Sequence, residues 1–343
     1  MTRPDAGNLG AMTVLPLPTT ADLRARRLIA QLLAPSAAHP RPNDLNGVAS
    51  YLTAIQAQNA AAGRDGLALR LGIAPGAVTP ADLAEAQVVR SWSQRGTHHL
   101  LAARDVRWIT LLCSPRVQRA SQKRRGRLGL TDTDVDRCRD ALLAAAGTPV
   151  TRTGAYALFR SIGVDPDDGR GPHMLRHFGG EGDLIQGTPI GGEETFLLHD
   201  VAVADPVDLT GPDALREIAV RYFRSRGPAT VHDLAWWTGL TMTDAKQATA
   251  LATATGTVVP AESTDGRTLY LADWQVDVTD EELADAVSPD RPPLCLPAFD
   301  EYLMAYTDRS DVMTPEVAKE VGPTRNGLAF PCSVHAGTVT GRR

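Results

Sequence analysis

The stretch VVRSWSQRGTHHLL, residues 88–101, decides how we interpret the fold. Two runs rich in strand-forming residues, 88–92 and 97–101, flank residues 93–96, where Gly96 sits at a turn position. This pattern is typical of a β-hairpin. Helix signals precede the hairpin, with apolar residues at helical spacing or a Thr-Pro start, at residues 20–33, 45–55, 60–71 and from Thr79-Pro80. Helices followed by a hairpin predict a winged helix-turn-helix domain.

The same order of helices and hairpin recurs twice along the chain. The second copy has helical patterns at 131–146, 153–162 and around 174–177, and strand patterns at 183–186 and 195–199. The third has helical patterns at 214–226, 231–238 and 243–253, and strand patterns at 257–259 and 268–271. Repeated units of this kind indicate tandem domains.

We therefore predict a mainly α protein with β-hairpin wings, an α+β fold. It consists of three tandem winged helix-turn-helix domains that form a curved scaffold, and a small C-terminal β-rich part. The predicted boundaries are a disordered leader at 1–19, winged helices at 20–127, 128–210 and 211–276, and the β-rich part at 277–343.

The sequence argues against four features: a membrane-spanning helix, a secretory signal, a zinc site and a disulfide framework. The chain has 343 residues and a net charge of −5, no apolar run long enough to span a membrane, and an N-terminus unlike a secretory signal. Its four cysteines are widely spaced without a C-x-x-C pair, which argues against a zinc site and against a disulfide framework. We expect a cytoplasmic monomer with no metal or cofactor and no contact with a membrane.

Basic residues are concentrated in one segment of this acidic chain. Residues 88–127 contain ten basic residues and a single acidic one, Asp105. Such segregation predicts a polyanion-binding surface, although a solvated charged face is the commoner cause of a charge run. The residues that we expect to contact DNA, mostly at phosphates, are Arg95, Arg116, Arg119, Lys123, Arg124, Arg125 and Arg127.

Gln56-Ala57-Gln58 places two amides two positions apart at the end of the second helical pattern. Glutamine is usually a surface residue, so the pair alone is a poor signal. Residues i and i+2 share a face on extended backbone but not on a helix. If both amides serve one site, the helix must end near Ala57.

Two further groups of residues are ambiguous in the sequence. Asp300, Glu301, Asp308 and Arg309 have apolar neighbours, so these charges either pair inside a core or belong to a site. His98 and His99 alternate on a strand, so that only one can face a site, and a structural role is expected for either. Three tryptophans are predicted to be core residues: Trp92, Trp236 and Trp237.

Taken together, the motifs resemble those of the AlkZ-like DNA glycosylases, bacterial proteins of three tandem winged helices and a β-rich C-terminal part. The similarity covers residues 20–343 and rests on these motifs: Gln56-Ala57-Gln58, residues 92–99, Gly227-Pro228-Ala229-Thr230 with Trp236 and Trp237, residues 297–303 and residues 306–309. The family pattern continues several tens of residues past 341, whereas this sequence stops at Arg343, so the C-terminal part is expected to be shortened or truncated.

The resemblance implies that Gln56 and Gln58 are catalytic, with His98, Asp300, Glu301 and Arg309 as neighbours. The implied reaction is hydrolysis of the N-glycosidic bond of N7-alkylated purines in double-stranded DNA. It extends to bulky adducts and interstrand crosslinks, in repair or in self-resistance to a DNA-alkylating natural product. Two amides can orient a water molecule, although Asp300 or Glu301 acting as a base is an alternative. The competing functions are a non-catalytic winged-helix DNA-binding protein or transcription regulator, and a scaffold for protein partners.

Overall fold

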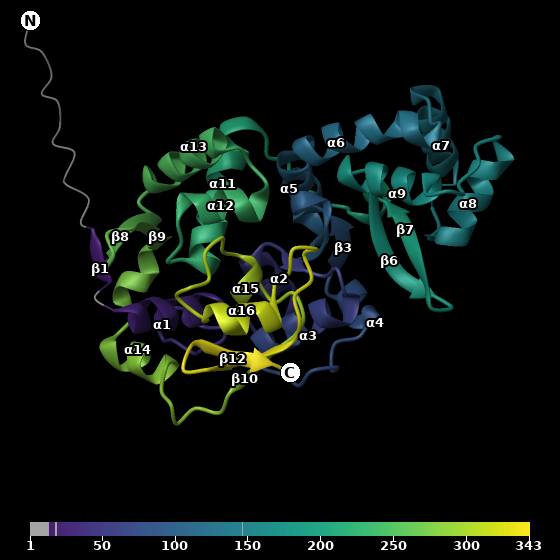
Figure 1. Ribbon diagram of the computed structural model, residues 1–343. Helices are drawn as coiled ribbons and strands as arrows, with labels where there is room; N and C mark the ends of the chain where they lie inside the picture. The colour runs from purple at the N-terminus through teal and green to yellow at the C-terminus, as the bar shows by residue number, and fades with distance from the viewer. Residues whose placement is uncertain (1–13, 18, 146) are drawn as a thin grey trace, which may run out of the picture.

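Helices surround three small β-sheets in the computed structural model, which describes residues 14–17, 19–145 and 147–343 (Figure 1). The disordered leader predicted for residues 1–19 lies largely outside the described residues. Where that segment is described, the prediction is wrong for strand β1 (Leu15–Leu17), which pairs in parallel with β8 (Val258–Ser263).

The N-terminal part follows the predicted order of helices and hairpin. Each predicted helix start carries a side-chain cap, from Thr19, Asp44, Asn59 and Thr79. The elements are α1 (Thr20–Ala30), α2 (Leu45–Leu52), β2 (Ile55–Gln56), α3 (Ala60–Leu71), α4 (Pro80–Glu85), β3 (Val88–Trp92), β4 (His98–Ala102), α5 (Val106–Cys113) and α6 (Pro115–Arg125). Helices α5 and α6 were not predicted. Helix α1 differs from expectation in its packing, because Ala25, Leu28 and Ile29 join a core with the C-terminal part.

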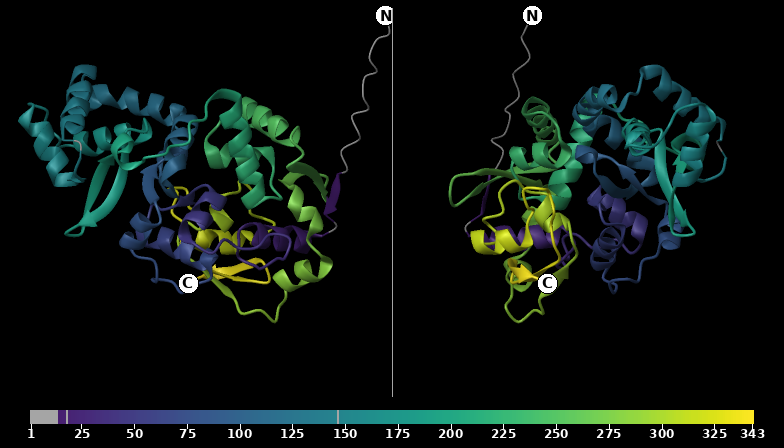
Figure 2. Two further views of the ribbon diagram at one scale, coloured as in Figure 1. Left: turned by 180° about the vertical axis from the view of Figure 1, so that it is seen from behind. Right: turned by 45° about the vertical axis from the view of Figure 1, so that its right-hand side comes forward.

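The second and third parts also show helices followed by a hairpin. The second contains α7 (Asp132–Ala144), β5 (Val150–Thr151), α8 (Arg152–Ser161), α9 (Arg170–Gly180), β6 (Leu184–Ile190), β7 (Glu193–Leu198) and α10 (His199–Ala202). The third contains α11 (Gly211–Arg226), α12 (Val231–Thr238), α13 (Met242–Thr253), β8 and β9 (Thr268–Ala272). The second part projects to one side of the molecule in every view, while the third lies against the first (Figures 1 and 2). The division into three winged-helix domains stays our interpretation.

The first two hairpins are joined edge to edge instead of standing free as separate wings. Strands β3 and β6 pair at Arg90 and Gln186, which produces one sheet in the order β2-β4-β3-β6-β7-β5. Trp92 of β3 packs in the core of the second part, beside helix α9. Pairing removes the exposed strand edges that each hairpin would otherwise present. The relative placement of the two parts is therefore fixed by backbone hydrogen bonds as well as by packing.

The C-terminal part covers the first part with a small sheet and short helices. Its elements are α14 (Asp280–Ala286), β10 (Leu294–Leu296), α15 (Glu301–Met304), α16 (Pro315–Val321), β11 (Cys332–His335) and β12 (Thr338–Arg342). Strands β10, β11 and β12 form an antiparallel sheet, but this part has more residues in helices than in strands, so β-rich is not an apt description of it. Helix α15 packs against β2, so this part reaches the Gln-Ala-Gln segment directly.

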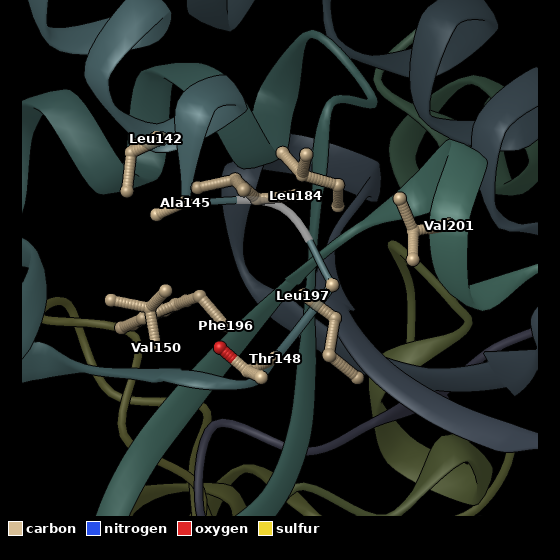
Figure 3. A pocket seen from close by; sticks show the side chains of 10 residues that line it. Leu142, Ala145, Thr148, Val150, Leu184, Phe196, Leu197 and Val201 are labelled. Atoms are coloured by element: carbon tan, nitrogen blue, oxygen red, sulfur yellow. The ribbon is translucent and has the colours of Figure 1, made fainter.

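A small cavity lies in the second part, between the end of α7 and strand β7 (Figure 3). Its lining is mostly apolar and includes Leu142, Val150 and Phe196. The volume of about 10 Å3 has room for about one water molecule. The cavity is thus too small for a nucleobase.

We expect Gly179→Ala to destabilise the junction between the first two parts. A Cβ at this position would lie 2.1 Å from Cε3 of Trp92, so the ring or helix α9 must shift. Overpacking of this kind costs about 1–3 kcal/mol of the free energy of unfolding, measurable by urea denaturation. Gly126→Ala is the control, because nothing lies near a Cβ there. Equal stability of the two variants would contradict this account of the junction.

Candidate functional site

The Gln-Ala-Gln segment begins where helix α2 is forced to stop. Thr53 adopts a positive φ of 68°, which ends the helix, and Ile55 and Gln56 form strand β2. The backbone N–H of Ala57 donates to the carbonyl of His98 at 2.8 Å, which continues the pairing with β4. The backbone is therefore extended from Ile55 to Ala57 and bends at Gln58.

Close packing of Ala57 fixes the position of this segment over helix α3. Ala57 is fully buried, and a Cβ added to Gly63 would lie only 2.7 Å from the Cβ of Ala57. A glycine at position 63 thus allows strand and helix to approach. Because Ala57 lies inside, the amides on either side of it are held at the edge of the sheet.

Gln56 is held at both its backbone and its side chain. Its backbone N–H donates to Oε1 of Glu301 at 2.9 Å, and its Oε1 accepts a hydrogen bond from Nη2 of Arg95 at 3.2 Å. Only 5% of Gln56 is exposed. Its Nε2 makes no hydrogen bond within the described residues, so the amide retains a donor for a substrate or water.

Gln58 has a different environment from Gln56. It is exposed, and its Oε1 accepts a hydrogen bond from the backbone N–H of His98 at 3.4 Å. Arg90 fixes the backbone here, donating through Nε to the carbonyl of Ala57 at 2.9 Å. The two amides thus differ in their surroundings. The side chain of Gln56 is buried and hydrogen-bonded to Arg95, while that of Gln58 is exposed to solvent.

Glu301 is a structural residue in this geometry, not a free base. Its Oε2 accepts hydrogen bonds from Nη2 of Arg226 and from the indole Nε1 of Trp237, each at 2.9 Å, while its Oε1 binds Gln56. The carboxylates of Glu301 and Asp300 are both about 1% exposed. Asp300 forms a two-point ion pair with Arg70, both bonds at 2.8 Å. The sequence left two possibilities for these acids, ion pairs inside a core or membership of a site. Both Asp300 and Glu301 form ion pairs inside the core.

Arg95 does not project freely from a wing, where we predicted a phosphate contact. Its Nη1 donates to the carbonyl of Trp237 at 2.6 Å, and its Nη2 donates to Gln56. The backbone has a positive φ of 55°, which non-glycine residues rarely adopt. Burial lowers the pKa of the guanidinium. The residue ties Gln56 to the end of helix α12.

The remaining predicted neighbours, Arg309 and His98, are both partly buried. Arg309 is half-buried, and its pKa is lowered to about 10 by desolvation, opposed by Asp233 and assisted by Arg95. Its Nη2 is buried without a hydrogen-bond partner in the described part of the chain. The ring of His98 contacts that of Trp92 in a tilted arrangement, and burial with the charge of Arg90 lowers the pKa of His98 to about 3, so it is neutral at pH 7.

The basic segment forms an exposed surface on helix α6 and the turn after it. Arg116, Arg119, Lys123, Arg124 and Arg127 are exposed and belong to none of the ion pairs in the described residues. Arg125 is the exception, because it pairs with Asp132 at 2.6 Å and contacts His177. We call the five exposed residues the α6 basic surface.

A further arginine, Arg176 of helix α9, joins the α6 basic surface to the turn that carries Arg95. A Cβ on Gly96 would lie 2.7 Å from its Nη2, so the guanidinium covers that turn. Burial and the charge of Arg124 lower the pKa of Arg176. Sequence reasoning missed Arg176, because it stands alone in an otherwise unremarkable helix.

Comparison with known proteins decides the family. The family model described as DNA glycosylase AlkZ-like matches residues 49–342. The chain belongs to the AlkZ-like DNA glycosylase family. Its fold is similar to that of DNA glycosylase AlkZ from Streptomyces sahachiroi, with a TM-score of 0.71, 24% identity and coverage of 93% of this chain and 86% of that chain. No curated relative matches the sequence.

Membership of the AlkZ-like family makes DNA the substrate and glycosylase chemistry the activity. Among the described residues, no cluster of three histidine, cysteine or acidic side chains could hold a metal ion. No described helix is long and apolar enough to cross a membrane. A cleft of about 560 Å3 between α4 and the β6–β7 hairpin is lined by neither Gln56 nor Gln58.

We predict that Glu301→Gln lowers the free energy of unfolding by about 3–5 kcal/mol, because it leaves Arg226 buried without a counter-charge. The amide keeps the size of the side chain, so the loss reports charge and not volume. Urea denaturation measures it, and Glu281→Gln on the surface of α14 is the control, expected to change stability by less than about 0.5 kcal/mol. A small effect at position 301 would show that the pair contributes no net stability.

Proposed function

We propose that this AlkZ-like protein is a monofunctional glycosylase that hydrolyses the N-glycosidic bond of N7-alkylated purines in duplex DNA. In this proposal Gln56 and Gln58 orient the attacking water. The observation that carries it is the double fixation of Gln56, by Glu301 at the backbone and by Arg95 at the side chain. A surface glutamine without a function needs neither contact.

Because of the chemistry of the proposed substrate, two amide side chains are sufficient for catalysis without a strong base. An N7-alkylated purine is already positively charged, so it leaves as a neutral base when the bond electrons pass to N9. The water oxygen forms the new bond to C1′, and the surplus proton passes to solvent. Gln56 can donate through Nε2 and still accept with the second lone pair of Oε1. Orientation of water by two amides therefore replaces proton abstraction as the main contribution.

The distribution of lysines supports a monofunctional enzyme. A glycosylase that also cleaves the strand needs an amine to form a Schiff base with C1′. The sequence has three lysines, Lys123, Lys246 and Lys319, which lie exposed on α6, α13 and α16. None of them contacts Gln56, whereas Arg95 does. Water is thus the nucleophile that the site favours.

An open site suits large lesions. Gln58 is exposed, and strand β2 is the edge strand of the six-stranded sheet. We extend the proposal to bulky adducts and interstrand crosslinks, repaired in base excision or removed in self-resistance to a DNA-alkylating natural product.

The decisive experiment measures excision of N7-methylguanine from a duplex, followed by alkaline cleavage of abasic sites. We expect Gln56→Ala and Gln58→Ala each to lower the single-turnover rate by about 100-fold or more, because water loses its orientation. DNA affinity should stay close to that of the wild type. Gln247→Ala, an exposed glutamine of α13, is the control and should keep full activity.

Two outcomes would overturn the proposal in different ways. Binding without strand scission by the wild type would favour a non-catalytic DNA-binding protein or regulator. Equal loss of affinity and rate in both variants would show that the amides hold DNA and do not act on water.

The α6 basic surface is proposed to bind DNA phosphates. Replacing Arg116, Arg119 and Lys123 together by glutamine should flatten the dependence of log K on log salt, by about 0.9 for each phosphate that is no longer neutralised. Arg160→Gln is the control, because Arg160 is already paired with Asp167 at 2.8 Å. An unchanged slope in the triple variant would exclude this surface from the DNA interface.

A further inference from the structure

An exposed tryptophan lies beside the proposed catalytic amide. Trp236 is 42% exposed, whereas its neighbour Trp237 is fully buried. Among the large hydrophobic side chains exposed in the described residues, Trp236 is the only aromatic one. The prediction that both are core residues is therefore wrong for Trp236. The exposed face of the ring is available for contact with a ligand.

Arg95 connects Trp236 to Gln56. The guanidinium carbon lies 5.6 Å from the centroid of the Trp236 ring, and Nη2 of the same side chain is 3.2 Å from Oε1 of Gln56. Nη1 also donates to the carbonyl of Trp236 at 3.2 Å. The ring and the amide therefore both lie beside the same arginine side chain.

Helix α12 holds the ring on a rigid support. Thr230 and Asp233 form a capping box at its start, and Gly239 ends it in a left-handed conformation. Asp233 also accepts hydrogen bonds from the backbone N–H and hydroxyl of Thr307, both at 2.7 Å. Trp237 anchors the other end of the helix to Glu301. The outward direction of Trp236 is therefore set by the fold.

We propose that Trp236 stacks on the damaged purine and so determines which base is presented to Gln56. This inference rests on the proposed function. Base–aromatic stacking is a common source of affinity at nucleic-acid sites, and an indole face attracts a cation. An N7-alkylated purine offers both a flat surface and a positive charge. Arg95 lies near the outer limit of cation–π contact, about 6 Å, which leaves the stronger close stacking position for a base.

The test compares binding to two duplexes that differ only in the presence of the base. One carries 2′-fluoro-N7-methylguanosine, which resists cleavage, and the other a tetrahydrofuran abasic analogue at the same position. Trp236→Leu should weaken binding to the first by roughly 10- to 100-fold and leave binding to the second unchanged. Trp236→Phe keeps a ring and should recover most of the affinity. Thermal denaturation verifies that both variants fold.

Intrinsic fluorescence gives an independent readout of stacking. Quenching on addition of the methylated duplex should persist in Trp274→Phe, whose indole packs against the core of the C-terminal part, and should largely disappear in Trp236→Phe. Equal weakening of binding to both duplexes, or no weakening in Trp236→Leu, would overturn the proposal. Because binding is measured on an uncleavable duplex, loss of the proposed activity and loss of stacking are distinguishable.

Discussion

The buried carboxylate of Glu301 is the interaction on which the site depends. A charge removed from water must be paired and fully hydrogen-bonded. Glu301 meets this requirement with Arg226 and Trp237 from the third part and with the backbone of Gln56 from the first. One side chain of the C-terminal part therefore fixes the first and third parts relative to each other. The position of Gln56 is a consequence of satisfying a buried charge.

The same logic explains why the acids near the motif are unavailable as bases. Asp300 is committed to Arg70, and Glu301 to Arg226, with all four side chains about 1% exposed or less. What remains at the surface of the site is a pair of amides and a set of cations. A neutral water-orienting group suits a substrate that needs little help from a proton donor, because its leaving base is already charged. The structural role of the acids and the proposed chemical role of the amides are therefore two results of one arrangement.

Local signals in the sequence were sufficient for much of the fold, but not for the site. Helix starts at Thr79, Thr131 and Thr230 were predictable because a capping residue acts within three positions. The contact of Gln56 with Glu301 spans 245 positions, which no local pattern encodes. Trp236 and Trp237 show the same limit. Two adjacent tryptophans differ only in helical phase, and the packing of α12 against Glu301 decides which one is buried.

The positive charges of Arg95 and Arg309 are only partly offset by acidic residues of the chain, by Glu301 at Arg95 and by Asp233 at Arg309. The charge of Arg95 lowers the pKa of Arg309, and burial lowers the pKa of both. Arg309 has a buried Nη2 without a hydrogen-bond partner among the described residues. Arg176 covers the turn at Gly96, and burial together with the charge of Arg124 lowers its pKa. Repulsion of this kind is relieved by a polyanion. DNA phosphates flank every sugar whose C1′ can be attacked, so under the proposed function a bound strand would also bring negative charge to these arginines.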